Sequence, residues 1–228
     1  MKRRLLDLYC SQGGAKRGYL LAGFDSVTGV DTNPLAGPYY GSNFVNGDAL
    51  EYLREEGGGF DAVHASPQCH RYSRSTSAID RSGYPDQIAE TREALETLGK
   101  PWVIENVEDA WRELRDPIML CGRQFGLTAV DDDGITLVMD RHRLFESNIP
   151  LDNPIHRKHG NEWVGGSYGG ARRDKYDAKY GRKGGYVPSI RVQQELLGID
   201  WMTQGGMFLS IPPVYTKFIG KQLLERIA

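Results

Sequence analysis

The sequence has few cysteines, and none are spaced as metal ligands usually are. Its 228 residues contain only Cys10, Cys69 and Cys121, with no CxxC pair. An odd, sparse set of this kind argues against a disulfide framework and against a structural zinc site, and it suits a reducing compartment. We therefore expect no bound metal and a cytoplasmic protein.

A dominant charge and a long apolar run are also missing. The 28 basic and 30 acidic residues give a formal net charge of −2, so any site for an anionic partner has to be local. Asp7 interrupts the apolar run near the start, which leaves that run too short for a signal peptide or a membrane span. We expect no membrane contact, and nothing in the sequence indicates an obligate protein partner. The length suits one domain with a sizeable core.

Strand and helix patterns alternate through the first half of the chain. Short apolar runs predict buried strands, and helical stretches that end at glycine predict helices. The predicted strands are 4–9, 27–30, 60–65 and 102–104, and the predicted helices are 15–22, 49–56 and 84–98. This alternation predicts an α/β fold with a mainly parallel sheet and helices on both faces.

The second half of the chain follows a different pattern. Segments 135–139 and 143–146 predict two strands that pair with each other, and 188–198 and 211–227 predict helices. We divide the chain into a core at 1–149, a small basic region at 150–187 and a segment at 188–228 that returns to the core.

The small basic region combines cations, aromatic rings and glycine. From 157 to 183 it has eight Lys or Arg residues against three acidic residues, in a chain that is nearly neutral. Cations neutralise phosphates and aromatic rings stack on bases, so this composition favours a nucleic-acid contact over a solvated loop. The residues assigned to this contact are Arg157, Lys158, Arg172, Arg173 and Lys175, together with Arg71.

Cys69 lies just beyond the predicted strand at 60–65, where open α/β sheets place their chemistry. One interpretation is a nucleophile whose thiolate is favoured by local positive charge. The alternative is a small apolar side chain in the core, which is the common fate of a free cysteine. On this segment alone the two interpretations stand equal.

The turn after the first predicted strand has the composition of a nucleotide-binding loop. It reads YCSQGG, from Tyr9 to Gly14. Its glycines let the backbone approach a ligand, and the following helix begins with free N–H groups. Asp31 is placed to accept hydrogen bonds from ribose hydroxyls and Asp48 from an adenine amino group. A helix cap and a plain turn acid are the respective alternatives.

Glu105 and two arginines complete the set of candidate residues. Glu105 follows the predicted strand at 102–104 and is suited to exchange a proton if burial raises its pKa. Arg141 and Arg143 would share one face of a strand and would clamp a phosphate or a carbonyl. A surface pair of salt bridges is the alternative.

In order, these segments resemble the motifs of DNA cytosine carbon-5 methyltransferases. The motifs are DLYCSQGG with AGF, GVDTNP, GDAL, SPQC, IENV, RHR and IPPVYTKFIG, between Leu5 and Leu224. The resemblance implies a Rossmann-like S-adenosylmethionine-dependent methyltransferase fold with the basic region as a small recognition insert. It also implies a cofactor site that consists of Tyr9, Cys10, Ser11, Gln12, Gly13, Gly14, Asp31, Thr32, Asp48, Ala49 and Pro67.

The resemblance further implies a covalent mechanism on double-stranded DNA. The target cytosine would be flipped out of the helix, because its ring cannot be reached in the stack. Cys69 would attack carbon 6, and Glu105 would bind or protonate N3. Arg143, with Arg141, would hold the base carbonyl or an adjoining phosphate while carbon 5 takes the methyl group.

Two departures from the family pattern lie beside the reacting groups. The family usually has Pro-Cys-Gln at the nucleophile, whereas this chain has Gln68-Cys69-His70, and Ser11 stands where the family prefers glycine. With Gln12, these polar groups suggest a modified donor such as carboxy-S-adenosylmethionine. RNA or a free cytidine nucleotide as substrate, and a non-catalytic relative that binds DNA or cofactor, remain open alternatives. The small recognition region predicts a short or degenerate target sequence.

Overall fold

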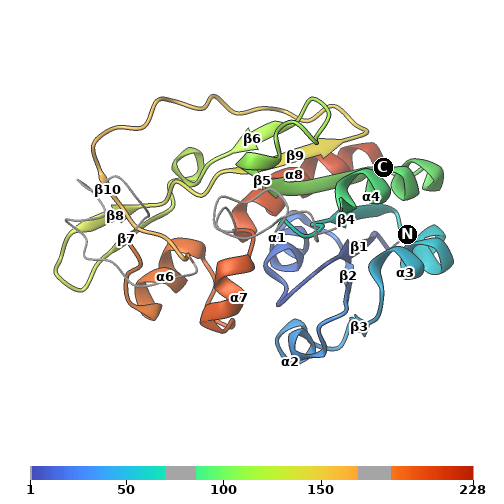
Figure 1. Ribbon diagram of the computed structural model, residues 1–228, viewed down its shortest axis with the longest axis horizontal. Coiled ribbons are helices and arrows are strands. Elements are labelled where there is room, and N and C mark those ends of the chain that lie inside the picture. The colour runs from blue at the N-terminus through green and yellow to red at the C-terminus, as the bar shows by residue number, and fades with distance from the viewer. Residues whose placement is uncertain (1, 70–85, 169–185, 228) are drawn as a thin grey trace.

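The central feature of the computed structural model, which describes residues 2–69, 86–168 and 186–227, is a seven-stranded sheet (Figure 1). Its order is β3-β2-β1-β4-β5-β9-β6. The strands are β1 (Arg4–Leu8), β2 (Ser26–Asp31), β3 (Phe44–Asn46), β4 (Ala62–Ala65), β5 (Trp102–Val107), β6 (Ile118–Leu120) and β9 (Arg143–Ser147). The first five strands run parallel, and β9 lies antiparallel between β5 and β6. The expectation of an α/β fold with a mainly parallel sheet is confirmed.

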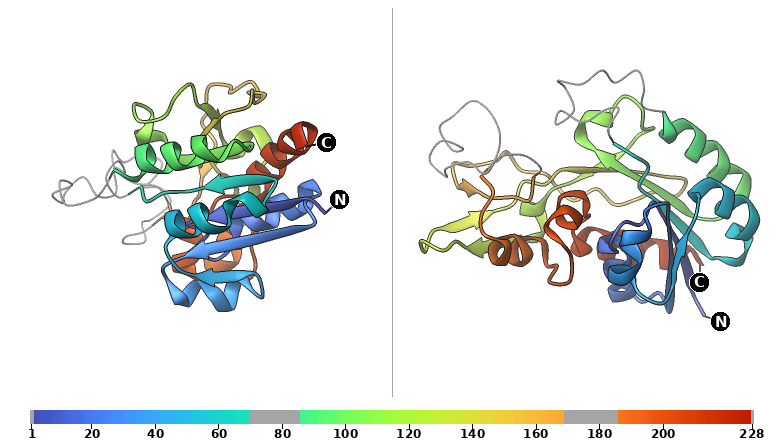
Figure 2. Two further views of the ribbon diagram at one scale, coloured as in Figure 1. Left: turned by 90° about the vertical axis from the view of Figure 1, so that its right-hand side faces the viewer. Right: turned by 60° about the horizontal axis from the view of Figure 1, so that its bottom comes forward.

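Helices cover both faces of this sheet (Figure 2). Successive side chains of a strand point to opposite faces, so Leu5 and Leu6 of β1 enter different cores. Leu5 packs with α1 (Gly14–Ala22) and α8 (Pro213–Ile227), whereas Leu6 packs with α3 (Ala49–Glu56) and α4 (Gln87–Leu98). A strand buried on both faces explains why the first segment is apolar at consecutive positions on either side of Asp7.

Glycine ends two helices as the sequence predicts, and an aspartate begins a third. Gly23 and Gly99 adopt left-handed conformations, with φ of 119° and 67°, directly after α1 and α4. Asp48 caps α3 by accepting hydrogen bonds from the backbone N–H groups of Leu50 and Glu51. Between β2 and β3 the chain forms two short helical turns, η1 (Pro34–Ala36) and α2 (Gly37–Tyr40), and η2 (Gly57–Gly59) follows α3.

A second, three-stranded sheet lies beside the first. It has the order β10-β8-β7, with β7 (Thr128–Val130), β8 (Thr136–Val138) and β10 (Trp163–Val164). Its core residues Ala129 and Leu137 pack with Val192 of α6 (Ile190–Leu197) and Met207 of α7 (Gln204–Leu209). This small sheet therefore contains strands from both sides of residue 150. The division of the chain into regions 1–149, 150–187 and 188–228 remains a prediction.

The predicted pairing of 135–139 with 143–146 is wrong. The first segment pairs with β7 in the small sheet, and the second pairs with β5 and β6 in the large sheet. The reason lies in burial, because Leu144 and Phe145 are adjacent yet both fully enclosed. Two neighbouring buried side chains require a covered surface on each face, which a central strand has and an isolated hairpin lacks.

In the ranges that the structure describes, no helix is both long and apolar enough to cross a membrane. The longest, α8, has 15 residues and packs along α1. Thr216 of α8 donates a hydrogen bond to the backbone oxygen of Ala15 at 2.9 Å, which fixes the two helices at close range.

Gly18→Ala tests this close approach of α1 and α8. A methyl group at Gly18 would overlap the Thr216 side-chain oxygen and the Pro213 carbonyl oxygen. Alanine favours a helix over glycine by roughly 1 kcal/mol, but overpacking costs about 1–3 kcal/mol. We expect a net loss in the free energy of unfolding, measured by urea denaturation. The control Gly58→Ala, which meets no neighbouring atom, should change it by less than about 0.5 kcal/mol. Equal stability of the two variants would contradict the packing argument.

Candidate active site

The carboxyl ends of five parallel strands meet at one cavity of about 340 Å³. Parallel strands end on the same edge of a sheet, so the segments after β1, β2, β3, β4 and β5 lie together there. Among the residues predicted for catalysis or cofactor binding, those that line the cavity are Cys69, Glu105, Arg143, Tyr9, Ser11, Asp31, Thr32, Asp48, Ala49 and Pro67. The structure thus brings most of the predicted site together.

The remaining residues of the first turn lie around this cavity but do not line it. Cys10, Gln12 and Gly14 border a small adjoining space of about 20 Å³ that shares Tyr9 and Ser11 with the main cavity. The Gln12 side-chain oxygen accepts a hydrogen bond from the backbone N–H of Thr203 at 3.0 Å, and its nitrogen donates to the Thr203 hydroxyl at 3.0 Å. Gln12 therefore joins the first turn to the start of α7.

The first turn has an unusual backbone. Tyr9 and Ser11 have φ of 58° and 45°, and Gly13 has φ of 85°. Left-handed conformations at non-glycine residues cost energy and cluster at ligand sites. Ser11, where the resemblance expects glycine, has such a left-handed conformation. The preference for glycine at this position therefore has a conformational reason. Its backbone N–H donates to the Asp31 carboxylate at 2.9 Å, so Asp31 holds the turn in place.

The two predicted cofactor acids have different partners. Asp31 accepts from the backbone N–H groups of Ser11 and Asn33, one on each carboxylate oxygen, and is not a helix cap. Asp48 is the cap of α3, and a single oxygen of its carboxylate accepts both hydrogen bonds. Both side chains line the cavity, so the structural role of Asp48 and a ligand contact are compatible.

The loop that carries Cys69 is held from β5 and α4. The Asn106 side-chain nitrogen donates to the Pro67 carbonyl at 3.0 Å, and the backbone N–H of Gln68 donates to the Gln87 side chain at 3.2 Å. Sequence reasoning gave Asn106 and Gln87 no role. The position of Asn106, directly after Glu105 at the end of a strand, was the available signal.

Glu105 is fully buried and forms an ion pair with Arg143, with Nε and Oε1 2.9 Å apart. Burial raises the pKa of the Glu105 carboxyl, and the two nearby arginines and a hydrogen bond from Ser66 oppose that rise. Behind Ser66 lies His64, whose Nε2 is 2.8 Å from the Ser66 hydroxyl and whose Nδ1 is 2.8 Å from the Tyr19 hydroxyl. Burial lowers the pKa of His64 to about 3, so this ring is neutral near pH 7.

Arg141 does not share the cavity with Arg143, contrary to the sequence expectation of one shared face. It precedes β9, and its guanidinium is buried and donates to the backbone oxygens of Ser167, Phe208 and Ser210 at 2.9, 2.6 and 3.1 Å. A cation that saturates buried carbonyls in this way holds the end of α7 against the central sheet. The structure thus gives Arg141 a positioning contact and leaves Arg143 facing Glu105.

Positive charge near Cys69 is present but is outweighed. Burial raises the pKa of the Cys69 thiol, Arg143 lowers it and Glu105 raises it, with burial the largest effect. Burial therefore works against the thiolate that the first interpretation of the sequence requires, and Arg143 works for it. Formation of the nucleophile requires that the thiol proton be removed.

The predicted nucleic-acid residues are only partly described. Arg157 and Lys158 are exposed on the loop between β9 and β10. Arg71, Arg172, Arg173 and Lys175 lie outside the residues that the structure describes.

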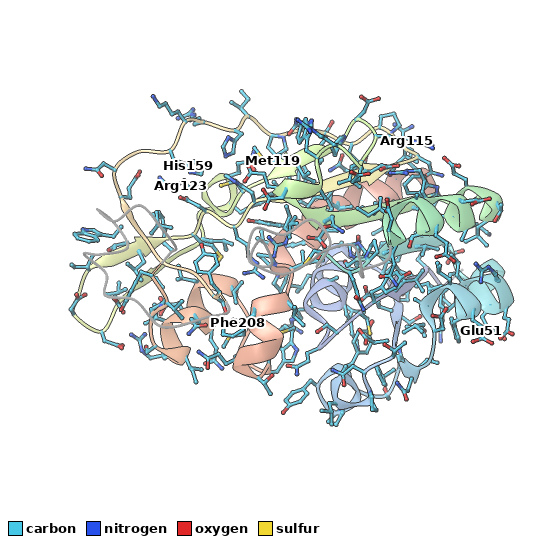
Figure 3. The ribbon with its side chains drawn as sticks, in the orientation of Figure 1. Glu51, Arg115, Met119, Arg123, His159 and Phe208 are labelled. Carbon is cyan, nitrogen blue, oxygen red and sulfur yellow. The ribbon has the colours of Figure 1, made fainter. Side chains whose placement is uncertain are left out.

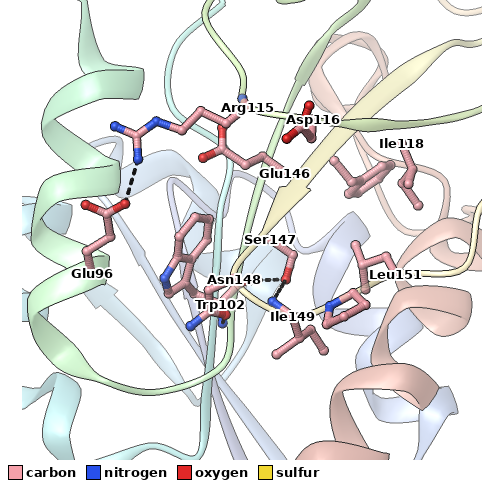
Figure 4. Close-up of a pocket in the computed structure, with 12 residues that line it drawn as sticks. Glu96, Trp102, Arg115, Asp116, Ile118, Glu146, Ser147, Asn148, Ile149 and Leu151 are labelled. Atoms are coloured by element: carbon pink, nitrogen blue, oxygen red, sulfur yellow. Dashed lines mark hydrogen bonds and ion pairs between the residues drawn. The ribbon is translucent and has the colours of Figure 1, made fainter.

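A larger cavity of about 700 Å³ lies elsewhere and contains none of the predicted residues. It is lined by Trp102 at the amino end of β5 and by Ser147 and Asn148 at the carboxyl end of β9 (Figure 4). Because these positions are on the opposite edge of the sheet, this cavity is separate from the candidate active site.

Comparisons with known proteins define the structural class. No protein-family model matches the chain, and no curated protein matches it. A solved protein that is encoded within an E. coli prophage and assigned as a DNA modification methyltransferase has a TM-score of 0.59 and 16% identity, covering 98% of this chain and 99% of its own. The Dnmt2 methyltransferase of S. pombe has a TM-score of 0.57 and 14% identity, covering 100% and 99%. The Entamoeba histolytica methyltransferase EhMeth has a TM-score of 0.56 and 10% identity, also covering 100% and 99%. The chain therefore has the fold of these methyltransferases over its whole length.

Alkylation of Cys69 by iodoacetamide tests the electrostatics of the cavity. Arg143→Gln removes the charge that lowers the thiol pKa, so alkylation near pH 7 should slow. Glu105→Gln removes a charge that raises it, so alkylation should accelerate. Below the pKa, each unit of change alters the thiolate fraction about tenfold. Peptide mass spectrometry distinguishes alkylation of Cys69 from that of Cys10 and Cys121. Equal alkylation rates in the two variants would contradict the opposite effects of Arg143 and Glu105 on the thiol pKa.

Proposed function

We propose that the chain transfers a methyl group from S-adenosylmethionine to carbon 5 of cytosine in DNA through a covalent adduct with Cys69. The observation that carries this proposal is the joint placement of Cys69, Glu105 and Arg143 in one cavity with Ser11 and Asp31 of the first two strand ends. The cavity then contains a nucleophile, an acid that exchanges a proton and a cation, next to a loop with the composition of a nucleotide-binding loop.

The residues of the cavity fit an adenosine-containing cofactor. The cavity volume of about 340 Å³ lies within the range of small-molecule pockets, roughly 300–1,000 Å³. Asp31 and Asp48 would accept hydrogen bonds from the ribose and the adenine, and the strained backbone at Tyr9 and Ser11 would bring the chain close to the ligand. When bound, S-adenosylmethionine supplies an electrophilic methyl group.

The protein groups perform the steps on the base. Cys69 bonds to carbon 6 of the flipped cytosine after loss of its thiol proton. Glu105, whose pKa is raised by burial, donates a proton or hydrogen bond to N3, which draws electron density from the ring. Arg143 lies against Glu105 and limits that rise, so the carboxyl remains able to give up its proton to N3. Once carbon 5 carries the methyl group, its proton passes to solvent, and the bond between Cys69 and carbon 6 breaks as the ring double bond re-forms.

Duplex DNA is the proposed substrate because of local positive charge. Arg157 and Lys158 are exposed, and the sequence of 157–183 is basic although the chain is nearly neutral. The same chemistry on RNA or on a free cytidine nucleotide is the alternative. Modification of RNA or of the free nucleotide, without modification of duplex DNA, would identify this alternative.

The modified donor, carboxy-S-adenosylmethionine, has less support than S-adenosylmethionine. Gln12 was one of the polar groups that suggested it, and its side chain is bound to Thr203 away from the main cavity. Nucleoside mass spectrometry of DNA from expressing cells distinguishes the two donors. 5-Methylcytosine alone excludes the modified donor, and a carboxylated methyl product establishes it.

A trapped complex tests the mechanism. Duplex DNA with 5-fluorocytosine in place of cytosine should form a denaturant-resistant adduct with the protein and cofactor, because the fluorine cannot leave as the proton does. Cys69→Ala should abolish the adduct and all modification.

Glu105→Gln should reduce kcat about 10²–10⁴-fold on normal DNA, as expected for loss of an acid–base group. Glu93→Gln, an exposed change on α4, serves as the matched control and should leave kcat unchanged. An adduct that persists in Cys69→Ala would overturn the proposed nucleophile.

A further inference from the structure

Four potential metal ligands converge away from the candidate active site. One ligand atom each from Cys121, His142, His156 and His159 lies within 4.8 Å of all the others. Cys121 follows β6, His142 precedes β9, and the other two come from the loop between β9 and β10. Cys121 is fully buried and the three histidines are half-buried. None of the four lines the 340 Å³ cavity.

Three of the separations between these ligand atoms are close to the edges of a tetrahedron around one ion. Bonds of about 2.0–2.1 Å to nitrogen and 2.3 Å to sulfur give tetrahedral edges of roughly 3.3 Å between nitrogens and 3.5 Å from nitrogen to sulfur. The His159 Nε2 is 3.3 Å from the His142 Nε2 and 3.1 Å from the His156 Nε2. It is 3.5 Å from the Cys121 Sγ.

Carboxylates set the tautomers of two of these rings. The His142 Nδ1 is 2.9 Å from the Glu108 carboxylate, and the His159 Nδ1 is 3.2 Å from the Asp140 carboxylate. A carboxylate accepts the proton on Nδ1, which leaves the Nε2 of a neutral ring with a lone pair. In that tautomer the Nε2 atoms of His142 and His159, which lie 3.3 Å apart, can both donate a lone pair to one metal ion.

We propose that Cys121, His142, His156 and His159 bind one Zn²⁺ ion in a structural site. One thiolate and three imidazoles at tetrahedral separations suit zinc, whereas Mg²⁺ and Ca²⁺ prefer oxygen ligands. Four protein ligands leave no open position, as in structural rather than catalytic zinc sites. Binding displaces the thiol proton of Cys121.

This zinc site would fasten the basic loop to the central sheet. Arg157 and Lys158 lie between two of the ligands in the sequence HRKH, so the ion would hold both ends of that segment. Arg123 supports the same cluster from η5 (Gly122–Phe125), because it pairs with Asp140 and lies beside His159 (Figure 3). The proposal does not depend on the proposed function, since metal content is measured without a substrate.

Elemental analysis of the full chain tests the proposal. The protein is expressed with added zinc and purified without a histidine tag or a chelator. Inductively coupled plasma mass spectrometry should find one zinc per chain. Cys69→Ser, a cysteine outside the cluster, should keep that zinc, and the double variant Cys121→Ser/His159→Ala should lose it. Folded wild-type protein without zinc, or a double variant that keeps as much as Cys69→Ser, overturns the site.

Cobalt substitution tests the geometry on the wild-type protein. Wild-type protein loaded with Co²⁺ in place of Zn²⁺ should show the intense visible bands of four-coordinate cobalt and a thiolate-to-cobalt charge-transfer band. Cys121→Ser alone should lose the charge-transfer band. Weak six-coordinate bands without charge transfer in the wild type contradict the proposed ligand set.

Discussion

The parallel direction of β1, β2, β4 and β5 is the constraint on which the candidate site depends. Parallel strands end on one edge, so residues up to about a hundred positions apart, such as Tyr9, Asp31, Cys69 and Glu105, line one cavity. No single loop supplies both a nucleophile and its acid. The parallel sheet therefore brings the site residues together, and the packing that keeps its strands in register holds them in place.

Two long-range contacts hold the second half of the chain against this edge. α8 packs on α1 through the close approach at Gly18, and Arg141 binds the backbone at the end of α7. Phe208 and Leu209, at that contact, line one side of the cavity. A buried guanidinium that satisfies several carbonyls is costly to disturb, so Arg141 positions this side of the cavity.

Burial shifts the pKa of two groups in the cavity in the same direction, with different consequences for their tasks. It raises the pKa of both Cys69 and Glu105, and Arg143 opposes both shifts. A protonated acid suits contact with N3 of cytosine, whereas a protonated thiol is not yet a nucleophile. One arginine thus adjusts two groups whose tasks require different protonation states.

The sequence alone determined the α/β alternation, most helix ends and the ordered set of residues that meet in the cavity. These features are local, because apolar runs, terminal glycines and polar residues at strand ends are visible within a few positions. The tertiary structure decided which sheet each late strand joins, the separation of Arg141 from Arg143 and the convergence of Cys121 with three histidines. Those outcomes depend on contacts between distant segments, for which spacing along the chain carries no signal.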